Sequence, residues 1–184
     1  MSTQAEKNPP QPEIDLLLEF VNTHDLEEET DAIADTAALR SLIAEHAGEY
    51  LPEIDEGDLR RILELRESLR ALLRTNNGGK TSDQELQALR DAAERSRYRL
   101  ACNQDGHLNL APARADLSGF ESRLLLAIER LQAEGAWPRL KACTDEECQW
   151  AFYDTTRNRS RTWCSMDVCG NREKTKRYRQ RKAS

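Results

Sequence analysis

Apolar residues recur every three or four positions through most of the first 137 residues, which is the period of helices with one buried side. The first such stretch has Ile14, Leu17, Leu18 and Val21 at this spacing. Alternate residues in it would also suit a short strand, and helix is the preferred interpretation. We therefore expect several amphipathic helices to build the core of this part of the chain.

Three more helices are predicted from start and stop signals. Asp35 or Thr36 can cap a helix that ends at Gly48. A Ser-x-x-Glu capping box at residues 82–85 opens another, and a second box at residues 118–121 opens the last one.

The longest helix is predicted after Pro52, and it ends before the Asn-Asn-Gly-Gly sequence at residues 76–79. Leucines and an isoleucine form its apolar side. Its arginines, with Arg66, Arg70 and Arg74 among them, fall largely on the opposite side. We therefore expect these arginines in solvent.

The apolar period shortens to two between the last two of these helices. Tyr98, Leu100 and Cys102 alternate with polar or small residues, residues 103–106 read as a turn, and leucines alternate again after it. This pattern predicts a β-hairpin. Cys102 is then expected to be a small core residue.

The predicted fold class is therefore mainly α, within the α+β class, with a small β-hairpin in a helical N-terminal domain. Residues 1–12 are polar and rich in proline, so we expect a disordered tail. Residues 13–137 form the helical domain. Pro138 disfavours helix at the residue before it, which places a boundary there and leaves residues 138–184 as a second module.

Four of the five cysteines lie in this second module, at Cys143, Cys148, Cys164 and Cys169. Two close pairs separated by a longer connection are typical of a structural zinc site. A short knuckle at the first pair and a helix starting near Ser165 at the second predict a treble-clef-like finger that ends in a basic helix. Four thiolates leave no open coordination position, so the one Zn²⁺ should be structural. Free thiols, disulfides and an iron site are the alternatives.

Charge divides the chain at the same place. Residues 1–138 carry 15 Lys and Arg against 27 Asp and Glu, whereas residues 139–184 carry 12 against 6. A basic end on an acidic domain favours a polyanion as partner. The apolar runs are far shorter than the roughly 20 residues that cross a bilayer. We therefore expect no membrane partner and a cytoplasmic protein, in which reduced cysteines bind metal more often than they form disulfides.

The sequence around the second cysteine pair resembles a known family. Thr156-Arg157-Asn158, Trp163-Cys164-Ser165-Met166 and Cys169-Gly170-Asn171-Arg172 are similar to the CGNR zinc finger family over roughly residues 139–182. Thr156 stands where serine is expected in that pattern, and it keeps the hydroxyl. Residues 18–23 and the helices after them resemble the ABATE domain, which accompanies this finger in stress-responsive transcription regulators. The resemblance implies the same four zinc ligands and a role in binding nucleic acid, with double-stranded DNA favoured over RNA.

Cationic residues in the finger are the candidates for that contact. On a helix that starts near Ser165, two neighbouring stripes hold Arg172, Lys176 and Arg179, and Lys174, Arg177 and Arg181. A second cluster before the third cysteine holds Arg157, Arg159 and Arg161. Gly170, Asn171 and Trp163 are expected to support the sulfur cage from outside.

Other functions have weaker support in the sequence. Asn22, Thr23 and His24 form a polar cluster that could line a small-ligand pocket in the N-terminal domain, although such a cluster is also typical of a helix cap and turn. That domain would sense a ligand or form a homodimer. No catalytic motif is present, so we do not expect an enzyme. The alternative to a regulator is a zinc-stapled adaptor whose basic helix binds an acidic partner, with the acidic N-terminal domain as one candidate.

Overall fold

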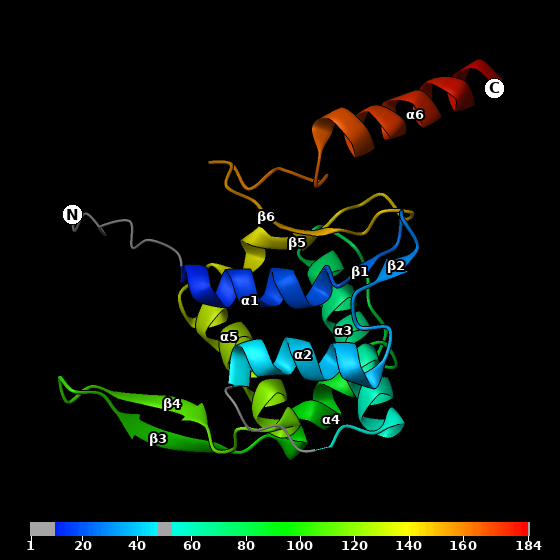
Figure 1. Ribbon diagram of the computed structural model, residues 1–184. Helices are drawn as coiled ribbons and strands as arrows, with labels where there is room; N and C mark the ends of the chain where they lie inside the picture. The colour runs from blue at the N-terminus through cyan, green and yellow to red at the C-terminus, as the bar shows by residue number, and fades with distance from the viewer. Residues whose placement is uncertain (1–9, 48–52, 184) are drawn as a thin grey trace, which may run out of the picture.

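The computed structural model describes residues 10–47 and 53–183 of the chain, and it confirms the mainly helical fold class (Figure 1). The helices are α1 (Gln11–Val21), α2 (Thr36–Ala47), α3 (Glu56–Thr75), α4 (Gln87–Arg95), α5 (Leu117–Ala133) and α6 (Asn171–Ala183). A 3-10 turn, η1 (Trp137–Arg139), follows α5, and a π-helical turn, η2 (Met166–Gly170), leads into α6.

Three antiparallel strand pairs connect the helices in the described part of the chain. The pairs are β1 (His24–Asp25) with β2 (Thr30–Asp31), β3 (Tyr98–Cys102) with β4 (Leu108–Pro112), and β5 (Leu140–Ala142) with β6 (Ala151–Tyr153). The predicted hairpin is thus present as β3–β4, with Leu100 opposite Leu110. The finger contributes the β5–β6 pair.

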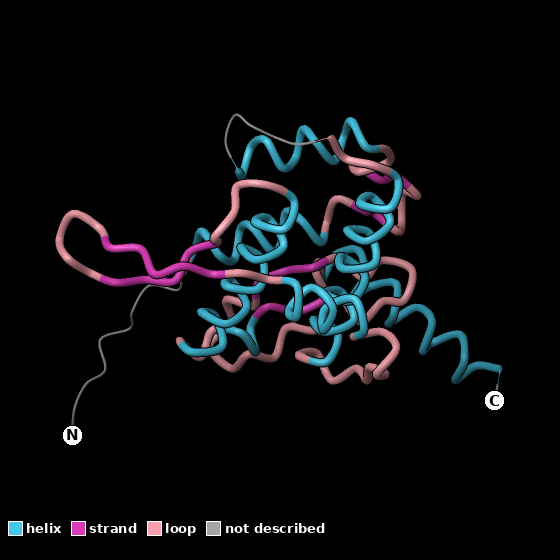
Figure 2. Tube along the Cα trace, turned by 90° about the horizontal axis from the view of Figure 1, so that it is seen from below, coloured by secondary structure: helices cyan, strands magenta, loops and turns pink. Residues whose placement is uncertain are grey.

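The helices α1, α2, α3 and α5 pack into one body, from which two elements project (Figure 1). The β3–β4 hairpin extends from one end of the body, and α6 extends from the opposite end. The second view shows the same separation (Figure 2). No helix of the described residues is long and apolar enough to span a bilayer.

One hydrophobic core runs from α1 into the finger. It is built on fully buried side chains such as Phe20 and Phe120, whose rings meet edge to face with centroids 5.6 Å apart. Leu140 and Ala142 of β5 and Ala151 of β6 belong to the same cluster. The hydrophobic contact therefore continues across the boundary expected at residue 138.

The prediction that the α3 arginines lie outside is wrong for two of them. Only 3% of Arg66 and 2% of Arg70 is exposed. Arg66 forms a forked ion pair with Asp31, in which both distances are 2.7 Å, and Arg70 donates to Glu67 at 2.9 Å. The helical period indicates which side of α3 is polar, but it cannot show that the β1–β2 loop folds back over that side.

Two helices start at residues other than those that the capping boxes predict. α5 begins at Leu117, where the Asp116 carboxylate accepts a hydrogen bond from the backbone N–H of Gly119, so the box at 118–121 lies inside the helix. The box at 82–85 makes its reciprocal hydrogen bonds, but α4 begins only at Gln87.

Three further expectations bear on the ends of elements and on Cys102. α1 begins at Gln11, inside the tail expected at residues 1–12, and residues 1–9 lie outside the described part. Gly48, the expected end of α2, also lies outside it. Cys102 is exposed rather than in the core, because the hairpin that carries it projects from the body.

Candidate metal centre and basic helix

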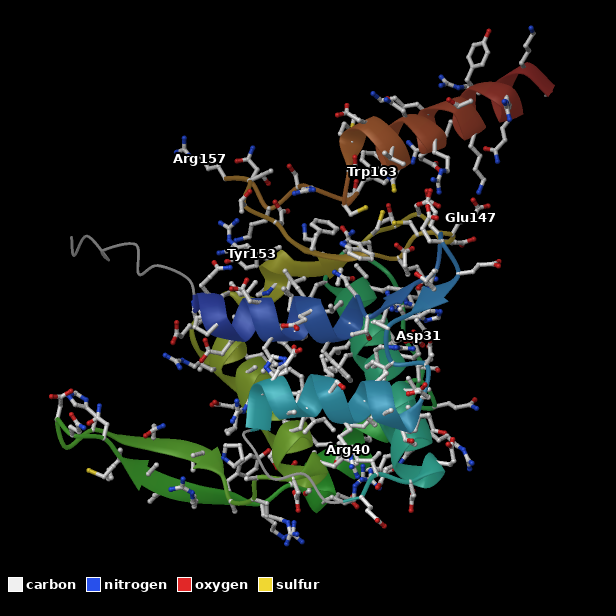
Figure 3. All side chains as sticks on the ribbon, in the orientation of Figure 1. Asp31, Arg40, Glu147, Tyr153, Arg157 and Trp163 are labelled. Carbon is white, nitrogen blue, oxygen red and sulfur yellow. The ribbon has the colours of Figure 1, made fainter. Side chains whose placement is uncertain are left out.

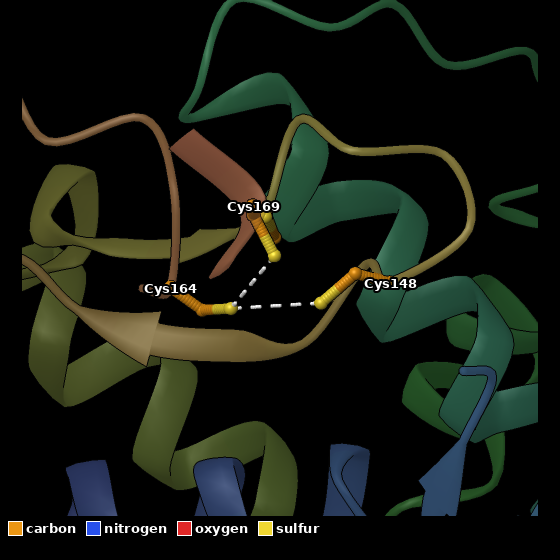
Figure 4. Close-up of side chains that lie close together, drawn as sticks. Cys148, Cys164 and Cys169 are labelled. Carbon is orange, nitrogen blue, oxygen red and sulfur yellow. Dashed lines mark hydrogen bonds between the residues drawn. The ribbon is translucent and has the colours of Figure 1, made fainter. Parts of the chain in front are cut away.

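The four cysteine sulfurs of the finger converge on one point. Figure 4 shows three of them, on Cys148, Cys164 and Cys169, pointing toward one another. All four lie within 4.8 Å of one another, with 3.5 Å between Cys148 and Cys164 and 3.7 Å between Cys164 and Cys169. A tetrahedral Zn²⁺ with Zn–S bonds of about 2.3 Å requires sulfurs about 3.8 Å apart. The sulfur set therefore fits one structural zinc with four thiolate ligands.

The first cysteine pair is held by a backbone knuckle between β5 and β6. The Cys143 N–H donates to the Trp150 carbonyl at 2.9 Å, and the Asp145 carbonyl accepts from the N–H groups of Cys148 and Gln149. Gln149 has a φ of 47°, in the left-handed region. This tight turn brings both sulfurs to the same side of the chain.

The second pair is placed by the helix start that the sequence predicts. Ser165 caps η2 by accepting a hydrogen bond from the Val168 N–H. The π-helical turn carries Cys169, and α6 continues from it at Asn171. The side chain of Asn171 donates to the Asp167 carbonyl at 2.9 Å, which braces the junction between the two helical segments.

Gly170 allows close packing on this junction. A Cβ atom built there would lie 2.5 Å from the Met166 sulfur and 3.5 Å from the ring of Trp163. Trp150 and Trp163 pack against the cysteines, whereas Phe152 lies outside that cluster. Gly170 therefore supports the cage by admitting neighbouring side chains, and Trp163 shields it from one side.

The pKa values of the four thiols are shifted by their hydrogen bonds to one another and by burial. A hydrogen bond from Cys148 lowers the pKa of Cys143 to about 5. The pKa of Cys148 is raised by the same bond, and burial raises the pKa values of Cys164 and Cys169. A bound divalent cation ends the competition of the four sulfurs for protons, because it stabilises all four groups as thiolates. The chemistry that the ion supplies here is structural, since no position is left for substrate.

A buried ion pair organises the loop before the third cysteine. Asp154 has no exposed surface, and its carboxylate accepts from Lys141 at 2.7 Å and from the Arg161 N–H at 2.9 Å. It also accepts from the N–H and the hydroxyl of Thr156. Lys141 in turn donates to the carbonyls of Arg159 and Arg161. The hydroxyl that Thr156 shares with serine is therefore used in the structure.

The three arginines of this loop differ in exposure. Arg157 and Arg159 are exposed, and Arg157 points away from the body (Figure 3). Arg161 is half-buried, donates to the carbonyls of Trp163 and Cys164, and lies over the Phe152 ring at 4.8 Å from its centroid. Arg161 thus holds the loop together, while the other two face solvent.

Helix α6 is polar on every side and projects into solvent. Its exposed cations are Lys174, Lys176, Arg177, Arg179, Arg181 and Lys182. Arg177 pairs with Glu173 at 2.6 Å. Arg172 differs, because it contacts Asp145 at 3.0 Å and pairs with Glu27 of the β1–β2 loop. Hydrogen bonding and charge attraction from these carboxylates raise the pKa of Arg172 further.

The polar cluster at the end of α1 is used within the fold. The Asn22 side chain donates to the Ala151 carbonyl at 2.9 Å and accepts from the Ala151 N–H at 2.8 Å, so it pairs with β6 of the finger. Thr23 donates to the Phe20 carbonyl, and His24 lies 3.4 Å from Glu67. A ligand pocket formed by these three residues stays a prediction.

Several residues that position the finger carry no motif. Asn76 donates to the carbonyls of Trp137 and Leu140, and Asn77 donates to those of Ala142 and Thr162, each at 2.8 to 2.9 Å. Arg70 reaches the Gln149 carbonyl at 3.1 Å. The two adjacent asparagines before two glycines are visible in the sequence, but that pattern predicts only the end of a helix and not a contact with the finger.

Comparison with known families accounts for both parts of the chain. Residues 139–182 match the CGNR zinc finger. Residues 15–145 match ABATE, a family described as "Putative stress-induced transcription regulator". No curated protein matches the chain. Both families are regulatory or zinc-finger types rather than enzymes. Because the second match covers well over half of the 184 residues, the chain belongs to the ABATE family, and it ends in a CGNR zinc finger.

Proposed function

We propose that this protein is a zinc-dependent regulator that binds double-stranded DNA through α6 and the 154–161 loop. The exposed, cationic α6 is the observation that carries the proposal. A helix that is polar on all sides buries no apolar stripe, so its sequence is not explained by packing in the core. Phosphate contacts from arginine and lysine explain both its charge and its exposure.

Zinc supports this role through its four ligands, Cys143, Cys148, Cys164 and Cys169. The second pair lies immediately before α6, which begins at Asn171, so the metal fixes where the basic helix begins. Arg157 and Arg159 extend the cationic surface from the other side of the finger. The residues expected to contact phosphate most directly are therefore exposed ones, and Arg161 and Arg172 mainly hold structure.

Binding to random-sequence duplex DNA tests the proposal. Fluorescence anisotropy should show binding that weakens with salt, with a log–log slope near −5 if about six phosphates are neutralised. Chelation of zinc should abolish it. Selection from a random DNA pool should enrich a motif only with zinc bound. Binding that is indifferent to salt and to chelator would contradict the proposal.

We also propose that the ABATE part forms a homodimer through the β3–β4 hairpin. Paired residues of the hairpin share a face, and one face carries Tyr98, Leu100, Cys102, Leu108 and Leu110. Leu100 and Leu108 are 68% and 67% exposed. A two-fold related copy presents the same face, so each apolar side chain gains an apolar neighbour. A groove lined by Leu16, Leu110 and Pro112 continues this surface toward α1.

Sedimentation velocity tests the dimer. The wild-type chain should sediment as a dimer, and Leu100→Glu with Leu108→Glu should give a monomer with unchanged zinc content. Because the hairpin and α6 lie at opposite ends, the monomeric variant should still bind DNA. A wild-type monomer would remove this part of the proposal and leave the DNA-binding part untouched.

The adaptor is the second candidate, because Arg172 already joins the finger to Glu27 of the N-terminal part. In that case α6 binds an acidic protein, and DNA competes weakly or not at all. The proposal also includes two further points: the ABATE part senses a ligand, and the protein is cytoplasmic. A ligand bound near Asn22 would act on β6 through the two Asn22–Ala151 hydrogen bonds.

A further inference from the structure

The two cationic stripes of α6 face different surroundings. Residues of one stripe, Lys176 and Arg179, line a groove whose other wall is the zinc knuckle with Asp145, Glu146 and Glu147. Figure 3 shows Glu147 on the side of α6 that faces the body. Arg172 is the first residue of this stripe, and it contacts Asp145 and Glu27. We call this stripe the inner face.

The other stripe points away from the knuckle. In an α-helix, successive residues are rotated by about 100°, so Lys174 and Arg181 lie on the opposite side of the axis from Lys176. Arg177, Tyr178 and Lys182 fall on the same half, and all five residues are exposed. We call this stripe the outer face.

The acidic wall along the inner face is built by two parts of the fold. Glu27 and Glu29 of the β1–β2 loop and Glu146 and Glu147 of the knuckle line a second groove beside Arg172. The side chain of Glu147 is 82% exposed. A phosphate that entered either groove would lie beside the carboxylates that line it, and screening over about 8 Å leaves repulsion between such close charges largely intact. Phosphates there would be repelled by the acids and obstructed by the body.

We propose that nucleic acid is bound by the outer face of α6, through Lys174, Arg177, Arg181 and Lys182, and that the acidic wall excludes it from the inner face. The inference rests on the proposed DNA-binding function and specifies its surface. Tyr178 lies in the middle of the outer face, where its ring can pack against sugar or base. The acidic wall thereby sets the orientation of the chain on its partner.

Two charge-matched double variants test this assignment. Lys174→Gln with Arg181→Gln removes two cations from the outer face, and Lys176→Gln with Arg179→Gln removes two from the inner face. The outer pair should weaken binding to duplex DNA by about 100-fold or more at low salt and reduce the magnitude of the salt slope by about 2. The inner pair should weaken binding less than about fivefold, with nearly the same slope as the wild-type chain.

Removing charge from the wall gives an independent measurement. Glu146→Gln with Glu147→Gln should tighten binding to duplex DNA severalfold and increase the magnitude of the salt slope, because phosphates can then contact the cations of the inner face. Zinc content and helical circular dichroism must be equal in all variants. If the wild-type chain binds no DNA, the proposed function falls together with the inference. If it binds and both pairs lose affinity equally, or the wall variant has no effect, only the inference is overturned.

Discussion

The buried Lys141–Asp154 pair should be the most sensitive point of the finger outside the zinc ligands. Asp154→Ala removes a carboxylate that accepts four hydrogen bonds, at 2.6 to 2.9 Å. It leaves the Lys141 ammonium with 5% of its side chain exposed and without its counter-charge. An uncompensated buried charge typically costs about 3 to 5 kcal/mol. The whole loss of folding free energy should fall in that range.

The loss can be measured with zinc-saturated protein by urea unfolding and by thermal melting. For a chain of this size about 1 kcal/mol shifts Tm by roughly 2 to 4 °C, so Tm should fall by about 6 to 20 °C. Asp105→Asn, in the exposed turn of the hairpin, is the matched control and should change little. Lys141→Met combined with Asp154→Ala should recover part of the loss. A loss below about 1 kcal/mol for Asp154→Ala would refute the reasoning.

The same pair should make stability depend on pH. Burial opposes ionisation of Asp154, but hydrogen bonds from Lys141 and Thr156 outweigh it and hold the pKa of this carboxyl well below its usual range. A depressed folded-state pKa gives stability that is present above the unfolded value of about 3.9 and is lost as pH falls toward the folded one. The difference between wild type and Asp154→Ala should therefore stay constant from pH 7 to 5 and shrink below about pH 4.

Three other substitutions test the metal centre and its attachment. Cys148→Ser should abolish stoichiometric zinc binding and reduce the helical circular dichroism by about the contribution of α6. Cys102→Ser is the control and should retain both the zinc and the helical signal. Equal zinc content in the two variants would contradict the four-cysteine site. Gly170→Ala should cost less than about 1 kcal/mol in urea unfolding, because the new methyl group meets the sulfur of a flexible, half-exposed Met166 side chain that can move aside. Adding Met166→Ala should remove that cost, and a loss above about 3 kcal/mol would contradict this reasoning. Arg70→Met should cost about 3 to 5 kcal/mol and weaken zinc retention against a competing chelator, and normal retention would show that its bond to the knuckle is dispensable.

Local patterns were enough for the parts of the fold whose cause is local. Paired cysteine spacing located the metal centre, Ser165 marked the start of the last helical segment, and alternating apolar residues identified the β3–β4 hairpin. In each case the signal and the structure involve residues close together in sequence. The outcome therefore depends little on the rest of the chain.

Contacts between distant segments could not be predicted in this way. Arg70 is buried because Val21 and His24 present carbonyl oxygens to it across 49 and 46 residues. Cys102 has the pattern of a core residue, yet it is exposed because the end of the hairpin that carries it extends beyond the described helices (Figure 2). Periodicity reports which side of an element is apolar, but it does not report what lies opposite.

The attachment of the finger to the body decides how a regulator of this kind can work. Asn22, Arg70, Asn76 and Asn77 satisfy backbone groups of the finger, and β5 and β6 share the main core. Zinc fixes the start of α6, while these contacts fix the knuckle against the ABATE part. A change in the ABATE part would therefore tilt α6 as a unit rather than release it. Cutting the chain at residue 138 would strip apolar cover from β5, so the two parts are better separated by single substitutions at the asparagines than by truncation.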